Sequence, residues 1–188
     1  MKKLLLAAIS LCISLNSIWA QDIFEKGDKV IGIGYGLGNT LHGAGYSRDF
    51  SPISATFEYG LKDGLLEDGR ASIGVGGYLG VSGDKFKYKY ADDLTQSGTA
   101  KLTDVVIGGK LNFHYQFIDK LDTYTGIMLG YDIVSKDHNP QGIAQSQVCF
   151  TWNAGAKYYI FDNFAVMGEI GWGAAILNLG LAYNIKNF

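Results

Sequence analysis

The sequence DVVIGGKLNFHYQF, residues Asp104–Phe117, alternates apolar and polar side chains along its length. One face carries Val105, Ile107, Leu111, Phe113, Tyr115 and Phe117. The other face carries Asp104, Lys110, Asn112, His114 and Gln116. A period of two is typical of a β-strand, because successive side chains point to opposite faces. The stretch is longer than the ~5–6 residues usual in soluble domains, and it predicts a strand with lipid on one side and water on the other.

The N-terminus has the organisation of a secretory signal peptide. A basic start and the apolar core Leu4–Leu15 precede a cleavage site that ends on the small residue Ala20. A spanning helix needs about 20 apolar residues, so a membrane anchor is the weaker alternative. We expect residues 1–20 to be removed and residues 21–188 to form one outer-membrane β-barrel domain.

Composition and charge restrict the possible function. Removing Lys2 and Lys3 with the signal peptide leaves 14 of the 16 basic residues against 18 acidic ones, a net charge of −4. This balance argues against nucleic acid as a partner. Cys149 is the single cysteine of the mature chain, so no internal disulfide framework is expected. Three scattered histidines and one cysteine lack the spacing of a metal site, and we expect no metal or other cofactor.

The alternation recurs along the chain and predicts an all-β fold, an eight-stranded antiparallel up-and-down transmembrane β-barrel. Each expected strand has about ten residues or more, the length needed to cross a bilayer at a tilt. The even number is the rule for bacterial single-chain barrels. The expected strands are Asp28–Gly38, Ser51–Leu61, Ala71–Ser82, Asp104–Phe117, Asp122–Val134, Gln145–Ile160, Phe164–Gly173 and Ile176–Phe188.

The connections predict the orientation. Those after the first, third and fifth expected strands, Asn39–Phe50, Gly83–Leu102 and Ser135–Ala144, are long or polar, and those after the fourth and sixth are short. Because outer-membrane barrels have long extracellular loops and short periplasmic turns, we expect both termini in the periplasm. Aromatic residues then form two girdles, where amphipathic rings are most stable. The periplasmic girdle is Tyr59, Tyr115, Phe117, Tyr158, Phe164 and Tyr183, and the outer girdle is Tyr35, Tyr131, Phe150, Trp152 and Trp172.

The first expected strand contains Gly32, Gly34 and Gly36, with a spacing like part of a dinucleotide-binding fingerprint. That fingerprint requires a strand, a turn and a helix in succession. No segment with helical periodicity follows these glycines, which argues strongly against this interpretation. We expect them to lie where facing walls of the lumen come close.

This pattern resembles that of the small eight-stranded outer-membrane barrels, the family of outer-membrane protein X and the outer-membrane protein A barrel. The most specific feature is the C-terminal Phe188 after an alternating strand. In that family a terminal Phe resembles the signal read by the barrel-assembly machinery, so the resemblance implies that Phe188 is an assembly signal. Phe188 is out of phase with Tyr183 and Ile185, which departs from the family pattern. We expect a monomer in a Gram-negative outer membrane, in contact with the bilayer and lipopolysaccharide.

Ionisable side chains on the inward faces are the candidate functional residues. Eight strands leave a lumen that side chains just fill, and an isolated buried ion is costly. We therefore expect acids and bases to pair as a structural plug, with a polar pathway or catalytic lumen as the alternative. The expected network is Glu58, Lys110, His114, Asp132, Lys157 and Glu169.

Basic residues in the longest expected connection form a second candidate site. Lys85, Lys87 and Lys89 alternate with aromatic residues. This segment would extend a strand above the membrane and contact lipopolysaccharide phosphates or a partner chain. The alternative is a solvated hairpin tip.

Two histidines, His42 and His138, lie on expected outer loops near Ser47 and Asp137. A lipid A-modifying enzyme would need a serine, a base and an acid within hydrogen-bond reach, but the spacing here matches no such motif. We expect a non-enzymatic barrel with a plugged polar lumen that acts through its extracellular loops in adhesion or envelope integrity. A lipid A-modifying enzyme and a narrow porin-like channel are the alternatives.

Overall fold

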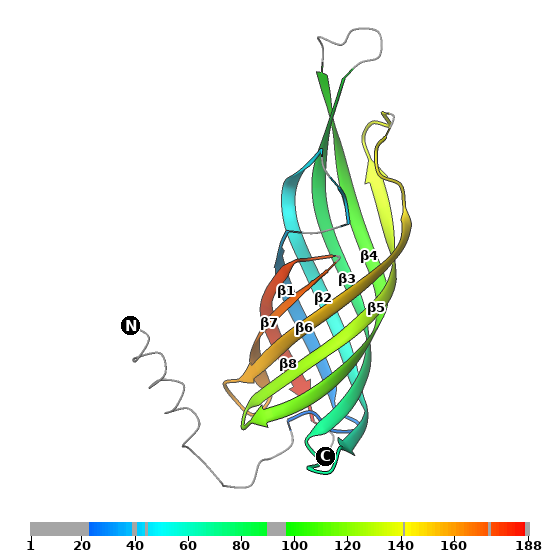
Figure 1. Cartoon of the computed structure of the whole chain (residues 1–188). Coiled ribbons are helices and arrows are strands. Elements are labelled where there is room, and N and C mark those ends of the chain that lie inside the picture. Colours follow the sequence, from blue (N-terminus) through cyan, green and yellow to red (C-terminus); the bar gives the residue numbers. More distant parts are fainter. Residues whose placement is uncertain are drawn as a thin grey trace, which may run out of the picture.

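The computed structural model describes residues 23–38, 41–43, 45–89, 97–140, 142–172 and 174–186. Eight strands in this part of the chain close into one barrel (Figure 1). Their bounds are β1 Lys29–Leu37, β2 Tyr46–Leu65, β3 Ala71–Lys89, β4 Ser97–Ile118, β5 Leu121–Lys136, β6 Gln147–Tyr159, β7 Phe164–Trp172 and β8 Leu177–Ile185. The predicted signal peptide and Phe188 lie outside the described residues.

Every strand pairs antiparallel with its sequence neighbours, and β1 closes the ring against β8. Lys29 lies opposite Ile185 at one end of this closing pair, and Leu37 lies opposite Leu177 at the other. The predicted up-and-down antiparallel barrel is therefore confirmed. None of the described residues forms a helix long and apolar enough to cross a membrane.

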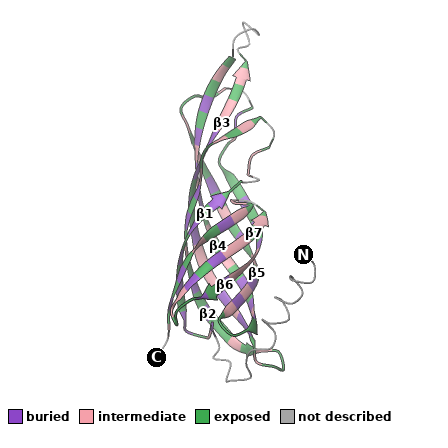
Figure 2. Cartoon of the chain, turned by 90° about the vertical axis from the view of Figure 1, so that its left-hand side faces the viewer, coloured by how far each residue is buried: buried purple, intermediate pink, exposed green. Residues whose placement is uncertain are grey.

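The faces of the wall follow the predicted alternation, which Figure 2 shows as alternating colours along the strands. On β4, His114 is 2% exposed and its neighbour Phe113 is 39% exposed. Large apolar residues are exposed on all eight strands. A barrel folded for water would place them inside, so this exterior is suited to lipid.

The aromatic girdles lie at opposite ends of the wall. Phe164 begins β7 and lies opposite Tyr183. Trp172 ends β7 and lies opposite Trp152. The two sets therefore flank the apolar residues between them, as predicted from the sequence.

Two connections were predicted to be longer than they are. In Gly83–Leu102, β3 continues to Lys89 and β4 already begins at Ser97. In Asn39–Phe50, β2 already begins at Tyr46. The cross-strand pairs continue without a shift from Ala71–Tyr115 to Lys89–Ser97, because nothing breaks the alternation where the wall leaves the membrane. The result is a hairpin that projects beyond the rest of the barrel (Figure 1).

The glycines of β1 were predicted to lie where facing walls of the lumen come close, but at Gly32 and Gly34 the nearest atoms belong to the neighbouring strands β2 and β8. A Cβ on Gly32 would lie 2.6 Å from Thr56 Oγ1 of β2. A Cβ on Gly34 would collide with the Asn178 side chain of β8. A larger residue at either position would force the Thr56 or Asn178 side chain to move.

The segment before β1 folds across the lower opening of the barrel. Ile23 and Phe24 are buried there among apolar residues of the wall. The Gly27 amide donates to the Gly60 carbonyl at 2.8 Å, and the Gly60 amide donates to the Asp28 carbonyl at 2.9 Å. A Cβ on Gly60 would collide with the Glu25 carbonyl, so glycine lets the segment lie directly against β2.

Leu111 lies midway along the apolar face of β4 and is 47% exposed. We therefore expect it to contact lipid. Leu111→Lys places a charge at mid-membrane and should destabilise the barrel by about 2–4 kcal/mol. The measurement is the fraction of heat-modifiable, folded protein after insertion into lipid vesicles. Thr99→Lys, on the outward face of the projecting hairpin, is the control and should fold as the wild type does. Equal yields for both variants would contradict the membrane-spanning assignment.

Candidate functional site

Four ionisable side chains from four strands form a closed ring of contacts in the lower lumen. Glu58 of β2 accepts hydrogen bonds from His114 Nε2 at 2.8 Å and from Lys157 Nζ at 3.1 Å. Asp122 of β5 lies 2.8 Å from His114 Nδ1 and accepts from Lys157 Nζ at 3.3 Å. Each of these side chains is at most 9% exposed. This lower ring joins β2, β4, β5 and β6.

The lower ring is electrically balanced. An ionised carboxylate only accepts hydrogen bonds, and both nitrogens of a protonated imidazole donate. Both His114 nitrogens face a carboxylate oxygen, so with Glu58 and Asp122 ionised the imidazole is protonated. Two positive charges then meet two negative ones. Buried charges are tolerated when they are paired and hydrogen-bonded in this way.

A second ion pair lies higher in the lumen. Glu169 Oε2 of β7 accepts from Lys110 Nζ at 3.0 Å, from Tyr124 OH at 3.0 Å and from Asn153 Nδ2 at 3.2 Å. The Tyr124 ring also lies under Lys157, whose Nζ is 4.5 Å from the ring centroid. The two groups of charges thus form one continuous polar network.

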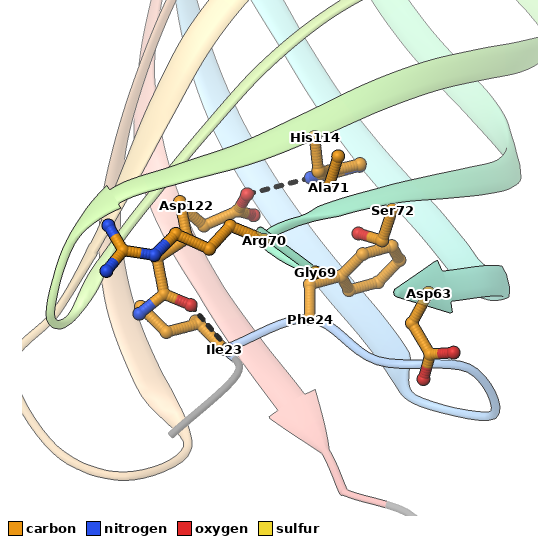
Figure 3. A pocket seen from close by; sticks show the side chains of 10 residues that line it. Ile23, Phe24, Asp63, Gly69, Arg70, Ala71, Ser72, His114 and Asp122 are labelled. Carbon is orange, nitrogen blue, oxygen red and sulfur yellow. Dashed lines mark hydrogen bonds and ion pairs between the residues drawn. The ribbon is translucent and has the colours of Figure 1, made fainter. Parts of the chain in front are cut away.

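The segment before β1 closes the network from below. The Phe24 ring stacks on His114 with 4.3 Å between centroids. Figure 3 shows Phe24 and Ile23 below His114 and Asp122, around a cavity of about 10 Å³. The cavities beside Lys110 and Glu169 have about 20 Å³ each. Since a single water needs about 10–15 Å³, each has room for one or two waters.

The structure brings five of the six predicted lumen residues into this network: Glu58, Lys110, His114, Lys157 and Glu169. Their partners Asp122, Tyr124 and Asn153 were not predicted from the sequence. The alternation along each strand does predict that these three side chains face the lumen. Strand register decides which inward residues of distant strands meet. Alternation of side chains along one strand does not give this register.

The sixth predicted residue, Asp132, lies in a separate group nearer the other end of the lumen. His42 Nε2 lies 2.8 Å from Asp104 Oδ1 and 4.0 Å from Asp84 Oδ2. Asp132 lies close enough to interact electrostatically with all three. The His42 side chain is 1% exposed. Burial opposes its protonation, but the Asp104 hydrogen bond and the surrounding carboxylates outweigh burial and raise the pKa of His42.

The predicted loop lysines lie on the projecting hairpin. Lys87 and Lys89 are exposed, whereas the half-exposed Lys85 pairs with Asp49. Lys101 lies directly opposite Lys85 across the hairpin. The alternation places Lys85, Lys87, Lys89 and Lys101 on one outward face, which we call the basic face.

Comparisons with known proteins identify the fold. The sequence matches no protein-family model and no curated protein. Ail, the attachment invasion locus protein of Yersinia pestis, has a similar structure at 11% identity and a TM-score of 0.50, over 85% of this chain and 99% of Ail. The fold is that of a small outer-membrane β-barrel. Ail in complex with the heparin analogue sucrose octasulfate gives 10% identity, the same coverage and a TM-score of 0.50. The N-terminal barrel of Pseudomonas aeruginosa OprF gives 15% identity and a TM-score of 0.44, over 85% of this chain and 98% of that domain.

The lower ring makes a prediction about Glu58. Glu58→Gln keeps the shape of the side chain but removes one of two negative charges, which leaves a net positive charge buried. Removing one partner of a buried ion pair typically costs about 3–5 kcal/mol. The measurement is urea-induced unfolding in lipid vesicles, followed by tryptophan fluorescence. Glu67→Gln, in the exposed turn after β2, is the matched control and should change stability by less than about 0.5 kcal/mol. Matching unfolding curves would contradict a paired-charge role for Glu58.

Proposed function

We propose that this protein is an integral outer-membrane barrel with a plugged lumen, without enzymatic activity, that acts through its outer loops in adhesion or envelope integrity. The observation that carries this proposal is the basic face of the β3–β4 hairpin, beyond the apolar band of the wall. The apolar exterior and the fold shared with Ail support a place in the outer membrane.

The contents of the lumen support a plug. A channel needs a continuous aqueous path, but the lower ring crosses the lumen from β2 to β6 with each of its side chains at most 9% exposed. Phe24 stacks on this ring from below. The cavities of about 10 and 20 Å³ have room for isolated waters rather than a file of hydrated ions.

The geometry of the basic face supports a polyanionic partner. Along β3 it continues the lipid-facing phase of Val81, and along β4 that of Val105. Because the hairpin also projects beyond the rest of the barrel (Figure 1), we expect its lysines at the height of lipid headgroups or above, where phosphates of lipopolysaccharide or sulfates of a glycan would reach them. Each lysine near an anionic membrane surface contributes about 1 kcal/mol. Ail was crystallised with a heparin analogue, which is a precedent for polyanion binding on this fold.

The surroundings of the two loop histidines give the enzymatic alternative no added support. His42 Nε2 contacts Asp104 inside the lumen, and His138 lies exposed 3.2 Å from Asp137. A serine hydrolase needs its histidine base on a serine hydroxyl as well as on an orienting carboxylate, and among the described residues neither imidazole is shown in contact with a serine. The non-enzymatic proposal is therefore the one that the geometry supports best.

The basic face makes a prediction about binding. The triple variant Lys87→Gln, Lys89→Gln and Lys101→Gln should bind polyanions about a hundredfold more weakly, since three contacts of about 1 kcal/mol each are removed. The measurement is a titration of protein in lipopolysaccharide-free nanodiscs with lipopolysaccharide and, separately, with heparin fragments. The stronger of the two titrations identifies the partner class. The control variant carries Lys26→Gln, Lys29→Gln and Lys62→Gln at the opposite end of the barrel. Equal affinity of both variants for both probes would contradict the proposal.

The plug makes a prediction about conductance. The wild-type protein in planar bilayers should give no regular conductance steps in KCl, because the lower ring and Phe24 block the lumen. The control is recovery of heat-modifiable protein from the same bilayer-forming vesicles, which shows that inserted barrels were present. Uniform steps that scale with salt concentration would favour the porin-like alternative.

A further inference from the structure

The lumen contains a second charged group that the plug does not use. It comprises His42, Arg48, Asp84, Asp104 and Asp132, and we call it the upper layer. His42 lies in the connection between β1 and β2, and the other members come from β2, β3, β4 and β5. Arg48 Nε pairs with Asp84 Oδ1 at 3.3 Å. Asp84, Asp104 and Asp132 are at most 3% exposed.

Apolar side chains enclose the upper layer on both sides. Along β4, Asp104 lies between the inward residues Leu102 and Val106. Val106 belongs to an apolar cluster with Tyr78, Met128 and Cys149, and Leu102 belongs to another with Ala100 and Ile143. His42 also stacks on Tyr46, with 4.8 Å between ring centroids. Charges enclosed in this way interact strongly, and unpaired ones are costly.

The upper layer is unbalanced, unlike the lower ring. Its three carboxylates face one guanidinium, which leaves a net charge of about −2 when His42 is neutral. Both carboxylate oxygens of Asp132 and Oδ2 of Asp104 have no hydrogen-bond partner among the described residues. Asp132 is nevertheless 0% exposed. Buried acceptors of this kind are usually satisfied by a bound cation, by water or by further donors.

We propose that the upper layer is a binding site for one divalent transition-metal ion. His42, Asp84 and Asp104 are the ligands, and Asp132 supplies the further negative charge and a fourth oxygen donor. Their three ligand atoms already lie within 4.8 Å of one another. Metal–ligand bonds of about 2.0–2.2 Å put neighbouring ligand atoms about 3–3.5 Å apart, which small side-chain rotations achieve. A dication would cancel the net charge of the layer.

The donor set indicates the class of ion. Carboxylates suit Mg²⁺, Ca²⁺ and Mn²⁺, and an imidazole among them favours Zn²⁺, so Zn²⁺ and Mn²⁺ are the ions to test. The site was not predicted from the sequence, because the spacing of histidines and cysteines does not reveal a site built mainly from aspartates on separate strands. Cross-strand pairing brings Asp84 next to Leu102, two residues from Asp104, and brings Val106 opposite Asp132.

A bound ion would act as a crosslink between a loop and the wall. His42 precedes β2, whereas its carboxylate partners are rigidly held in β3, β4 and β5. Coordination would therefore hold His42 inside the lumen mouth. The competing explanation is a protonated His42 that pairs with Asp104 without any ion. Direct binding measurements distinguish the two.

The test uses untagged protein refolded in lipopolysaccharide-free detergent, treated with EDTA and dialysed. Calorimetric titration with ZnCl₂ and, separately, MnCl₂ should show one ion bound per chain. His42→Gln and Asp132→Asn should each weaken binding about tenfold or more. His138→Gln, which changes an exposed histidine, should bind as the wild type does. Heat-modifiable migration establishes that each variant is folded, and if Asp132→Asn does not fold, His42→Gln alone decides.

A second measurement, thermal stability, distinguishes a metal site that stabilises the folded barrel from incidental binding of the ion. Ligands that bind only the folded state raise its thermal stability by mass action. The bound ion should raise the temperature at which wild-type protein loses its folded gel migration, but not that of His42→Gln. Cys149→Ser should retain binding, because the thiol lies in the apolar cluster beneath the site. The proposal is overturned if neither ion binds saturably, if His42→Gln binds as the wild type does, or if Cys149→Ser abolishes binding.

Discussion

Closure of the backbone hydrogen-bond ladder is the constraint on which the rest of the structure depends. No water is available in the bilayer core to satisfy an open strand edge, so a spanning sheet must close on itself. The pairing of β1 with β8 meets this requirement. Closure with eight strands also fixes the bore, which is just wide enough for side chains to fill. The outward face then needs only apolar surface, whereas each inward polar side chain must find its partner within the lumen.

The two charged groups of the lumen meet that requirement in different ways. The lower ring is self-sufficient, because each carboxylate of Glu58 and Asp122 contacts both His114 and Lys157. The upper layer has three aspartates to one arginine, and both oxygens of Asp132 lack a partner among the described residues. An apolar cluster around Val106 and Met128 separates the two groups. Lys110 and Lys157 therefore neutralise acids below this cluster and leave those above it unbalanced.

Much of the fold could be predicted from the sequence, because one rule decides it: alternation places Leu111 in lipid and Asn112 in the lumen. The rule does not show where the membrane ends, since the hairpin beyond Gly83 continues to alternate in water. Nor does it give register. Alternation predicts that Asp122 and Asp132 face the lumen. It does not predict that they have different neighbours, because these depend on the register of the strands around the barrel. His42 reaches the lumen from a connection, where no periodicity applies.

The same physics explains how a common fold persists at 10–11% identity to Ail. Lipid discriminates weakly among apolar side chains, so outward positions such as Ile107 and Leu129 tolerate many substitutions of similar polarity. Inward positions are stricter, because replacing His114 or Lys157 would leave charges on other strands without partners. The inward side chains therefore depend on one another. We expect two barrels of this fold to differ in whole networks of inward side chains rather than in single residues. In the upper layer the network is incomplete, because the described side chains do not neutralise its three aspartates.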